Sequence, residues 1–333
     1  MNWNEIKGQE INLRALREWL SWEQGGHAVL LTGPPGSGKS ALAILIAQAL
    51  NCENKDQAPC GWCSCCYRIN RGTFPEVVTI EPEGRWIKIE QVREVHQNLN
   101  LRLQEGNFRV CLMEEAHTLT REAAASWLKS LEEPGEDVKY ILTSSLPSRM
   151  LPTIVSRCAH LKLKRLTVKQ VNELLQFQFP EVSAEKIEFA ARISQGLPGR
   201  AREVLTDDRW ESRYNQAGDL VGRLFRGEAL EAELLQEAQE WSSREDLASL
   251  LEMLVMIYRD GLLSSYGLEE ETLTDFFAGQ GKKETGGVST LYWKQSMELI
   301  EETQKVISTT NASVQLALEA MFLSLKRRMM IDV

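Results

Sequence analysis

Residues 33–40, with the sequence Gly-Pro-Pro-Gly-Ser-Gly-Lys-Ser, match the pattern G-x-x-x-x-G-K-[ST] of loops that bind nucleotide phosphates. Glycines let backbone N–H groups close around phosphate oxygens, because no Cβ stands in the way. Lys39 adds a positive charge for the β- and γ-phosphates, and the hydroxyl of Ser40 is a ligand for Mg²⁺. We therefore predict a binding site for ATP and Mg²⁺ formed by Gly33, Gly36, Gly38, Lys39 and Ser40.

Two adjacent carboxylates, Glu114 and Glu115, follow the apolar run 109–113 and are the second candidate for chemistry at this site. In an ATPase with such a loop, the first carboxylate holds Mg²⁺, often through water, and the second orients the attacking water. The first position usually carries Asp. Because Mg²⁺ tolerates little departure from octahedral geometry, the longer Glu114 could displace the ion. The alternative is that both carboxylates simply end a strand at a solvated edge.

Five of the seven cysteines lie within residues 52–66, and four of them have the spacing of a tetrahedral metal site. Cys60, Cys63 and Cys66 follow one another at C-x-x-C intervals, and Cys52 lies eight residues before Cys60. Zn²⁺ in a structural site takes four such thiolates at about 2.3 Å. We predict a structural zinc site formed by these four cysteines, with Cys65 competing with Cys66 for the fourth position. The alternative is a redox or incidental cysteine cluster.

The composition is that of an ordinary soluble globular protein, with 333 residues, 43% hydrophobic and 26% charged, and a net charge of −9. It excludes a disordered or fibrous chain, and no apolar stretch approaches the ~20 residues that span a bilayer. Residues 1–7 lack the features of a secretion signal, and an odd number of cysteines fits a reducing compartment. We therefore expect a cytoplasmic protein with no membrane partner. The negative charge argues against a surface that coats nucleic acid uniformly, but it leaves room for a local basic groove.

Apolar runs that favour strands alternate with helical periodicity through the first 165 residues. The segments predicted as strands are 27–31, 77–80, 109–113, 140–143 and 160–163. The segments predicted as helices are 11–22, 40–50, 89–103 and a helix that begins after Thr120 and ends before Pro134. This alternation predicts an α/β domain whose parallel sheet is covered by helices on both faces. The cysteine segment is too short and polar to be expected in the core.

Strand patterns end after residue 165, and helical periodicity follows. Thr167, Ser183 and Pro198 each begin a short helix, which predicts a three-helix domain over residues 166–207. Residues 208–333 are predicted to form an all-α domain, with a polar gap at 278–287 that begins as a flexible loop. The predicted domains are therefore 1–165, with the cysteine module at about 52–66, then 166–207 and 208–333.

Several segments occur together in one order: residues 6–10 (IKGQE), the phosphate loop with the cysteine insert after its helix, residues 128–134 (LKSLEEP) and residues 151–158 (LPTIVSRC). On these segments the chain resembles the bacterial clamp-loader subunits. The resemblance implies an AAA+ ATPase domain over 1–165, a helical lid over 166–207 and a helical collar over 208–333 through which subunits oligomerise. It also implies the partners, which are tau/gamma and delta subunits in a hetero-pentamer, the sliding clamp, and the primer–template DNA on which the clamp is placed.

The resemblance also assigns roles to two residues. Arg157 takes the position of an arginine finger that reaches the γ-phosphate of ATP on a neighbouring subunit. Thr143, at the end of a predicted strand, matches the residue that senses the γ-phosphate. The simpler alternatives are a surface salt bridge for Arg157 and an ordinary β-branched strand residue for Thr143. Which basic residues contact DNA stays open, and the candidates are Arg102, Arg149, Lys162, Lys164, Arg165 and the run 326–328.

Two departures from the family bear on catalysis. Active motor subunits carry an Arg three residues after the glycine that corresponds to Gly196, but this chain has Gly199 there and Arg200 about 100° further around a helix. Together with Glu114, this predicts a subunit that binds ATP, hydrolyses it weakly and contributes Arg157 in trans. One alternative is an active motor subunit of the tau/gamma type, which the chain length and the missing lid Arg disfavour. Another is a stand-alone P-loop ATPase of DNA repair, which leaves the cysteine insert and the later motifs unexplained.

Overall fold

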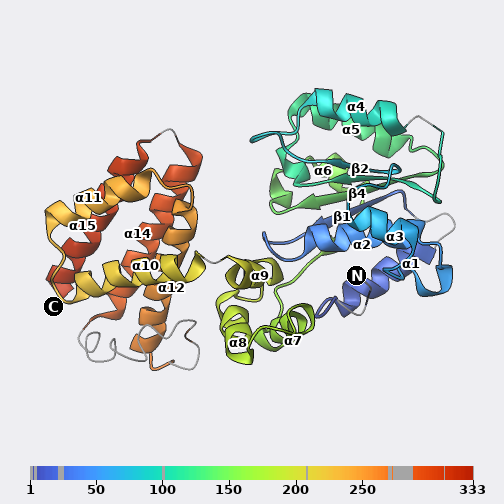
Figure 1. Ribbon diagram of the computed structural model, residues 1–333. Coiled ribbons are helices and arrows are strands. Elements are labelled where there is room, and N and C mark those ends of the chain that lie inside the picture. The colour runs from blue at the N-terminus through green and yellow to red at the C-terminus, as the bar shows by residue number, and fades with distance from the viewer. Residues whose placement is uncertain are drawn as a thin grey trace. The chain divides into compact units, whose positions relative to one another are not determined.

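The computed structural model describes residues 3, 6–21, 26–99, 102–207, 209–268, 272, 288–310 and 312–332. The chain divides into two compact units, residues 1–205 and residues 206–333, which are coloured from blue to green and from yellow to red in Figure 1. The polar gap predicted at 278–287 lies outside the described residues. Within the described part of the chain, no helix combines the length and the apolar character needed to cross a membrane.

Five parallel strands form the sheet of the first unit, in the order β2-β3-β4-β1-β5. Their bounds are β1 (Ala28–Thr32), β2 (Val77–Ile80), β3 (Arg109–Met113), β4 (Val138–Ser144) and β5 (Ala159–Lys162). Every residue of β1 and β3 is buried, which explains their mainly apolar sequences. The predicted parallel sheet is therefore confirmed, and each strand ends within two residues of its predicted bound.

Helices cover both faces of this sheet (Figure 1). One face carries α1 (Glu10–Ser21), α2 (Lys39–Asn51) and α3 (Ser64–Asn70), and the other carries α4 (Ile89–Leu99), α5 (Arg121–Glu132) and the short α6 (Pro152–Val155). Because side chains alternate along a strand, β1 directs Val29 and Leu31 to the first face, and Ala28 and Leu30 to the second. The predicted covering of both faces is confirmed.

Three helices follow β5, namely α7 (Val168–Gln178), α8 (Ala184–Ile193) and α9 (Pro198–Thr206). Thr167 and Ser183 cap α7 and α8 as predicted, because each hydroxyl oxygen accepts a hydrogen bond from the backbone N–H three residues on. Gly196 lies just before α9 with a φ of 79°, and a Cβ there would lie 2.2 Å from the carbonyl oxygen of Leu166. Only glycine fits this turn, which sets the direction in which α9 begins.

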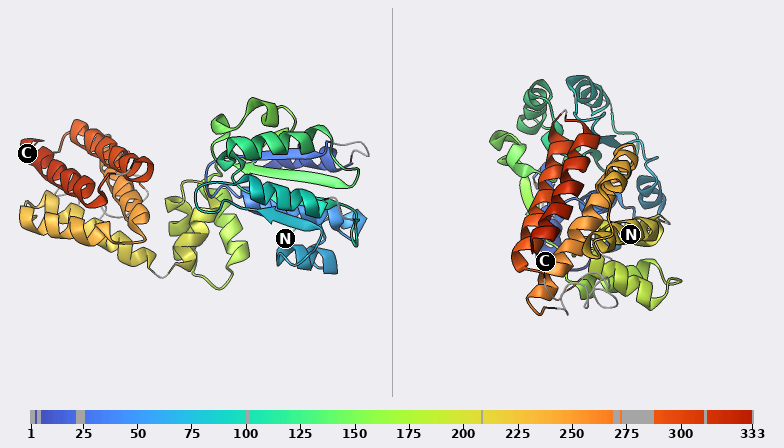
Figure 2. Two further views of the ribbon diagram at one scale, coloured as in Figure 1. Left: turned by 90° about the horizontal axis from the view of Figure 1, so that it is seen from above. Right: turned by 90° about the vertical axis from the view of Figure 1, so that its left-hand side faces the viewer.

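Within its described residues, the second unit contains helices joined by turns and loops, and no strand. Its helices are α10 (Trp210–Phe225), α11 (Glu231–Ser242), α12 (Leu247–Ser265), α14 (Thr290–Thr309) and α15 (Val314–Asp332). Helix α12 packs against α10 and α14, and α15 packs against α11 and α14 (Figure 2). At the crossing of α12 and α14, a Cβ on Gly261 would lie 2.3 Å from the buried Trp293 ring, so this close approach requires glycine.

Two sequence predictions about local structure are wrong. The helix predicted over 89–103 ends at Leu99, where the buried Arg109 guanidinium donates hydrogen bonds to the carbonyl oxygens of Asn98, Leu99 and Arg102. Arg109 thereby satisfies carbonyl groups at the C-terminal end of α4 that would otherwise lack a partner. The cysteine segment, expected to stay out of the core, contains α3, and its cysteines pack in the core beneath α2. Short helices at Lys55–Gln57, Ala116–Thr118 and Pro147–Arg149 were also not predicted.

Candidate nucleotide and metal sites

The phosphate loop, residues 33–40, leaves the end of β1 and enters α2. Gly36 and Gly38 have φ values of 75° and 93°, in the region that favours glycine, and Gly38 is the N-cap of α2. The buried ammonium group of Lys39 donates to the carbonyl oxygens of Gly33, at 3.1 Å, and Pro34, at 3.2 Å. The loop is therefore curled around the lysine that a phosphate would contact.

Ser37 supplies a test of whether this loop fits phosphate. Its hydroxyl oxygen is buried, and it has no hydrogen-bond partner among the described residues. A buried hydroxyl without a partner costs free energy unless a ligand or water supplies one. Together with the N-terminal N–H groups of α2 and the charge of Lys39, this unused donor fits an anionic oxygen. The residues present therefore fit a nucleotide phosphate.

The acidic pair lies directly beside the loop, as the sequence predicted. The hydroxyl of Ser40 donates to Oε2 of Glu114 at 3.1 Å, and Nζ of Lys39 lies 3.4 Å from Oε1 of Glu115. The hydroxyl oxygen of Thr143 accepts a hydrogen bond from the backbone N–H of Glu115 at 3.0 Å. Glu114 and Glu115 directly follow β3, Thr143 lies in β4, and Lys39 and Ser40 begin α2, so the parallel sheet brings all five residues to one edge.

Glu115 is held by partners that sequence analysis missed. Its Oε2 accepts hydrogen bonds from the backbone N–H and the hydroxyl of Ser145, both at 2.7 Å, and lies 3.2 Å from Nδ1 of His117. Its backbone has a φ of 46°, an uncommon conformation for a residue with a side chain. The position of Ser145, directly after β4 and two residues from Thr143, was the signal that could have revealed this contact.

The two carboxyl groups have opposite pKa shifts. Burial raises the pKa of Glu114 above its usual value, and the hydrogen bond from Ser40 opposes this only in part. Burial would also raise the pKa of Glu115, but the hydrogen bonds from Ser145 and the charge of Lys39 lower it overall. Glu115 is therefore a fixed anion at neutral pH, whereas Glu114 is the carboxyl group that takes up a proton more readily.

The start of α9 closes onto the phosphate loop. The backbone N–H of Gly199 donates to the carbonyl oxygen of Gly36 at 2.8 Å. A Cβ on Gly199 would lie 2.8 Å from Cα of Gly36, so a side chain at this position would push the two backbones apart. The sequence shows only that Gly199 stands where an Arg is expected, because the contact joins residues that are far apart in the chain.

Four of the five clustered cysteines come together as predicted. The sulfur atoms of Cys52, Cys60, Cys63 and Cys66 all lie within 4.8 Å of one another, and tetrahedral zinc with bonds of about 2.3 Å requires about 3.8 Å. The sulfur of Cys65 instead lies 3.4 Å from a carboxylate oxygen of Glu53, outside this set. The geometry therefore separates Cys66 from Cys65, which the spacing in the sequence could not do.

Backbone N–H groups wrap the sulfur atoms of this cluster. Cys60, Cys63 and Cys66 donate from their backbones to the sulfurs of Cys52, Cys60 and Cys63 at 3.3–3.4 Å. Burial alone would raise the pKa of Cys60, but the N–H groups of Trp62 and Cys63 outweigh it and lower this pKa to about 7. At Cys60 these N–H···S contacts favour the thiolate, which is the form that binds a metal, whereas burial raises the pKa of Cys52 and Cys66 while no metal is bound. The donor set fits Zn²⁺.

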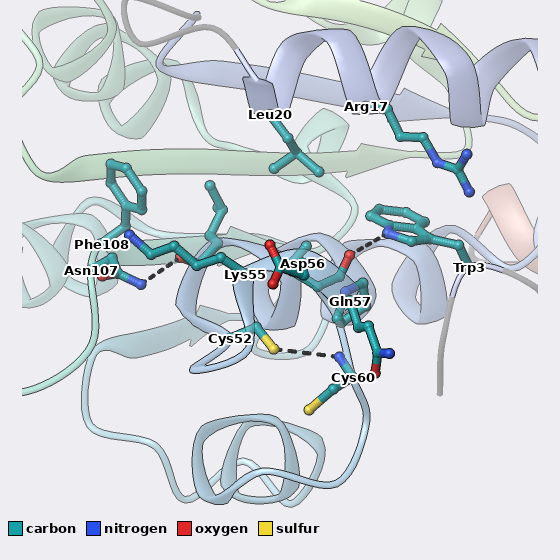
Figure 3. A pocket seen from close by; sticks show the side chains of 14 residues that line it. Trp3, Arg17, Leu20, Cys52, Lys55, Asp56, Gln57, Cys60, Asn107 and Phe108 are labelled. Carbon is teal, nitrogen blue, oxygen red and sulfur yellow. Dashed lines mark hydrogen bonds between the residues drawn. The ribbon is translucent and has the colours of Figure 1, made fainter.

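Figure 3 shows an open cavity that borders the cysteine cluster. Cys52 and Cys60 lie at the wall of an open cavity of about 1010 Å³, together with Arg17 and Phe108. The Trp3 indole N–H donates to the carbonyl oxygen of Ala58 at 2.7 Å and ties the N-terminal segment to the cysteine module.

Arg157 lies outside the nucleotide site of its own chain. Its Nη2 atom is 2.6 Å from Oε1 of Glu132, and its Nη1 atom donates to the carbonyl oxygen of Thr153 at 3.0 Å. The side chain is 35% exposed. The structure therefore groups the predicted nucleotide ligands together and the predicted zinc ligands together, while Arg157 is presented separately near α5 and α6.

The sheet order, the phosphate loop, the adjacent carboxylates and the helical segment that meets the loop define a P-loop protein of the AAA+ class. The family model described as DNA polymerase III, delta subunit, matches residues 8–167. The chain is 35% identical to the delta' subunit of DNA polymerase III from Pseudomonas aeruginosa, over 66% of this chain and 67% of that protein. It belongs to the family of DNA polymerase III delta' subunits.

Other proteins are similar to this chain over different shares of its length. The delta' subunit from Bacillus subtilis is 26% identical over 98% of this chain and 99% of its own length. The tau subunit from Escherichia coli is 37% identical over 61% of this chain, but the match spans only 31% of that subunit. A solved structure of a gamma subunit-related protein from Thermotoga maritima covers 96% of this chain and 99% of its own, with 17% identity and a TM-score of 0.49.

Proposed function

We propose that this chain is the delta' subunit of a clamp loader. It would assemble in the cytoplasm with tau/gamma and delta subunits into a hetero-pentamer that uses ATP to load the sliding clamp onto primer–template DNA. The observation that carries this proposal is the match to a delta' subunit over 98% of this chain and 99% of that relative. For the domains, we propose a nucleotide-binding domain over 1–165, a lid over 166–207 and an oligomerising collar over 208–333.

In this proposal, the chain binds ATP and Mg²⁺ through its own phosphate loop. Lys39 and the N–H groups of Gly36 and Gly38 would contact the phosphates, and Ser40 and Glu114, which are hydrogen-bonded to each other, would hold the metal ion. Turnover by this site is weak, because Glu115 is tied to Ser145 and cannot easily orient a water molecule. Gly199 also occupies the lid position at which active motor subunits carry an arginine, and its backbone N–H contacts the loop.

Arg157 is proposed to act on ATP bound to a neighbouring subunit. The guanidinium group carries a permanent charge and a planar set of donors, which suits the charge that develops on a transferred phosphoryl group. It is partly exposed and contacts Glu132 and Thr153 rather than the loop of its own chain, which supports action in trans. The cysteine module is proposed to bind a structural Zn²⁺ that holds α3 against α2.

The test compares ATP hydrolysis by this chain alone with hydrolysis by an assembly of this chain, tau/gamma and delta subunits, the clamp and primed DNA. We expect little turnover by the chain alone, and turnover in the assembly that falls about 10³-fold with Arg157→Ala, the lower end of the effect of arginine fingers. Unchanged turnover with Arg157→Ala, in an assembly that forms normally, would remove the proposed role in trans.

The intact phosphate loop favours one second candidate, an active motor subunit of the tau/gamma type. In that case the chain alone would hydrolyse ATP at an appreciable rate, and Lys39→Ala would abolish the activity. In our proposal Lys39→Ala abolishes nucleotide binding by this chain but leaves the neighbour's site, which depends on Arg157, intact. The same two variants therefore distinguish the candidates.

A further inference from the structure

The ion pair between Arg157 and Glu132 joins two helices at their C-terminal ends. Glu132 is the last residue of α5, and Arg157 follows α6. The C-terminal end of a helix carries partial negative charge and disfavours a carboxylate. Local helix stability therefore does not explain a glutamate at this position, whereas a contact at 2.6 Å with a guanidinium does.

The contacts of Arg157 fix its guanidinium group and leave part of it available. Nη2 of Arg157 donates a hydrogen bond to the carboxylate of Glu132, and Nη1 donates one to the carbonyl oxygen of Thr153. A guanidinium has five N–H donors, so Nε–H and one further donor on each terminal nitrogen remain for another anion. A free arginine side chain has about 2 kcal/mol of rotamer entropy to lose, and two anchoring contacts remove part of that loss before the anion arrives.

We infer that Glu132 is a positioning residue for Arg157, an inference that rests on the proposed function. Glu132 does not touch the nucleotide; it orients the guanidinium so that its remaining donors face the phosphate of the neighbouring subunit. The contact persists when phosphate is bound, because the donors that Glu132 and Thr153 occupy are not the ones that phosphate needs. Losing it should therefore reduce the rate of the chemical step rather than the affinity for ATP.

Glu133 provides a matched control. It is the adjacent residue, carries the same charge near the same helix end, and is exposed. Within the described residues its carboxylate forms no ion pair. Replacing either glutamate by glutamine removes one negative charge from this region, but only Glu132→Gln removes the charge from the Arg157 contact.

The experiment measures steady-state ATP hydrolysis by the assembly containing this chain, tau/gamma and delta subunits, the clamp and primed DNA. Glu132→Gln should lower kcat about two- to fivefold, equivalent to about 0.4–1 kcal/mol at 1.36 kcal/mol per tenfold, with KM for ATP unchanged. Glu133→Gln should leave both constants unchanged. Glu132→Asp, which keeps the charge, should restore part of the lost kcat. In an Arg157→Ala background, Glu132→Gln should have no further effect.

Three outcomes would overturn the inference: full or raised kcat with Glu132→Gln, an equal loss with Glu133→Gln, or the same loss in the Arg157→Ala background. The last outcome would assign Glu132 a purely structural role. Failure of the proposed function is distinct, because Arg157→Ala itself would then leave turnover unchanged. A lowered kcat with Arg157→Ala and normal kcat with Glu132→Gln would preserve the function and reject only the positioning role.

Discussion

At the scale of single residues, Glu114 and Glu115 are neighbours in sequence with different electrostatic environments. Glu114 is half-buried and has one hydrogen bond from Ser40, so burial makes its charged form less favourable and raises its pKa. Glu115 is surrounded by donors and a lysine, so its charged form is favourable. Such separation of two carboxyl pKa values is typical of functional sites, where one group stays ionised and the other exchanges a proton or binds a cation.

This difference predicts opposite effects on stability in the absence of nucleotide. Because the native pKa of Glu114 is raised, native protein binds more protons than unfolded protein just above the ordinary carboxyl pKa, and stability falls as pH rises through that window. Glu114→Gln removes this cost and should raise the thermal midpoint at pH 7.5 by about 1–3 °C. The gain should disappear below the unfolded pKa, where both states are protonated.

Glu115→Gln should have the opposite effect on the stability of the nucleotide-free protein. The native pKa of Glu115 is lowered, so its charge contributes stability above its native pKa that is lost as pH falls toward and through that value. Its replacement should therefore lower the midpoint at pH 7.5, with a smaller effect at acidic pH. Calorimetry on both variants over a pH series checks the pair, and shifts of the same sign at pH 7.5 would contradict the assignment.

At the scale of elements, α3 is the helix that begins within the cysteine cluster. Its N-cap is Cys63, whose sulfur accepts the backbone N–H of Cys66, so a predicted metal ligand also begins the helix. Cys65, one residue before Cys66, is buried too, but its sulfur faces Glu53. The helix thus directs two adjacent thiols to different sides, about 100° apart.

Replacing Cys66 or Cys65 should have different effects on the zinc content of the protein. Cys66→Ser should lower zinc content from about one ion per chain to well below that value, because one of four thiolates is lost. Cys65→Ser should retain zinc, because its sulfur is not part of the cluster. Elemental analysis of purified variants measures both, and metal loss with Cys65→Ser but not Cys66→Ser would contradict the ligand set.

The close contact between α9 and the phosphate loop should not tolerate a side chain at Gly199. Gly199→Ala would put a Cβ 2.8 Å from the Gly36 backbone, which must move α9 away from the loop. We expect faster amide hydrogen exchange over the start of α9 and a thermal midpoint lowered by several degrees. The control is Gly222→Ala in α10, where the Cβ would meet only the flexible end of Arg226, so stability should hold or rise slightly. Unchanged exchange in Gly199→Ala would contradict the contact.

Features carried by consecutive residues were predictable from the sequence, and those made by distant residues were not. The phosphate loop and the C-x-x-C spacing could be recognised because their chemistry needs neighbours in the chain. The end of α4 could not, because Arg109 binds its carbonyls from a strand. The same reason hid Ser145 beside Glu115, and Gly36 beside Gly199. Helix α3 was missed because cysteines were assigned to metal binding alone, whereas buried cysteines also pack as small apolar side chains.

At the scale of the whole molecule, each compact unit has a core of its own. The first unit packs its helices on the two faces of the sheet, and the second packs aromatic side chains such as Tyr258, Tyr292 and Trp293 between its helices. The nucleotide residues and the cysteine cluster all belong to the first unit. A ligand that binds only one native unit raises the stability of that unit by mass action.

We therefore predict two thermal transitions for the full chain, of which only one responds to ligands. Adding Mg²⁺ and ATP at about 100 times the dissociation constant should stabilise the first unit by about 2.7 kcal/mol and shift its transition upward by several degrees. Removing zinc with a chelator should shift the same transition downward. The transition of residues 206–333 should stay fixed in both experiments, and Lys39→Ala should abolish the response to ATP but keep the response to the chelator. A single transition that moves as a whole with ATP would contradict this prediction, because the two cores would then unfold together.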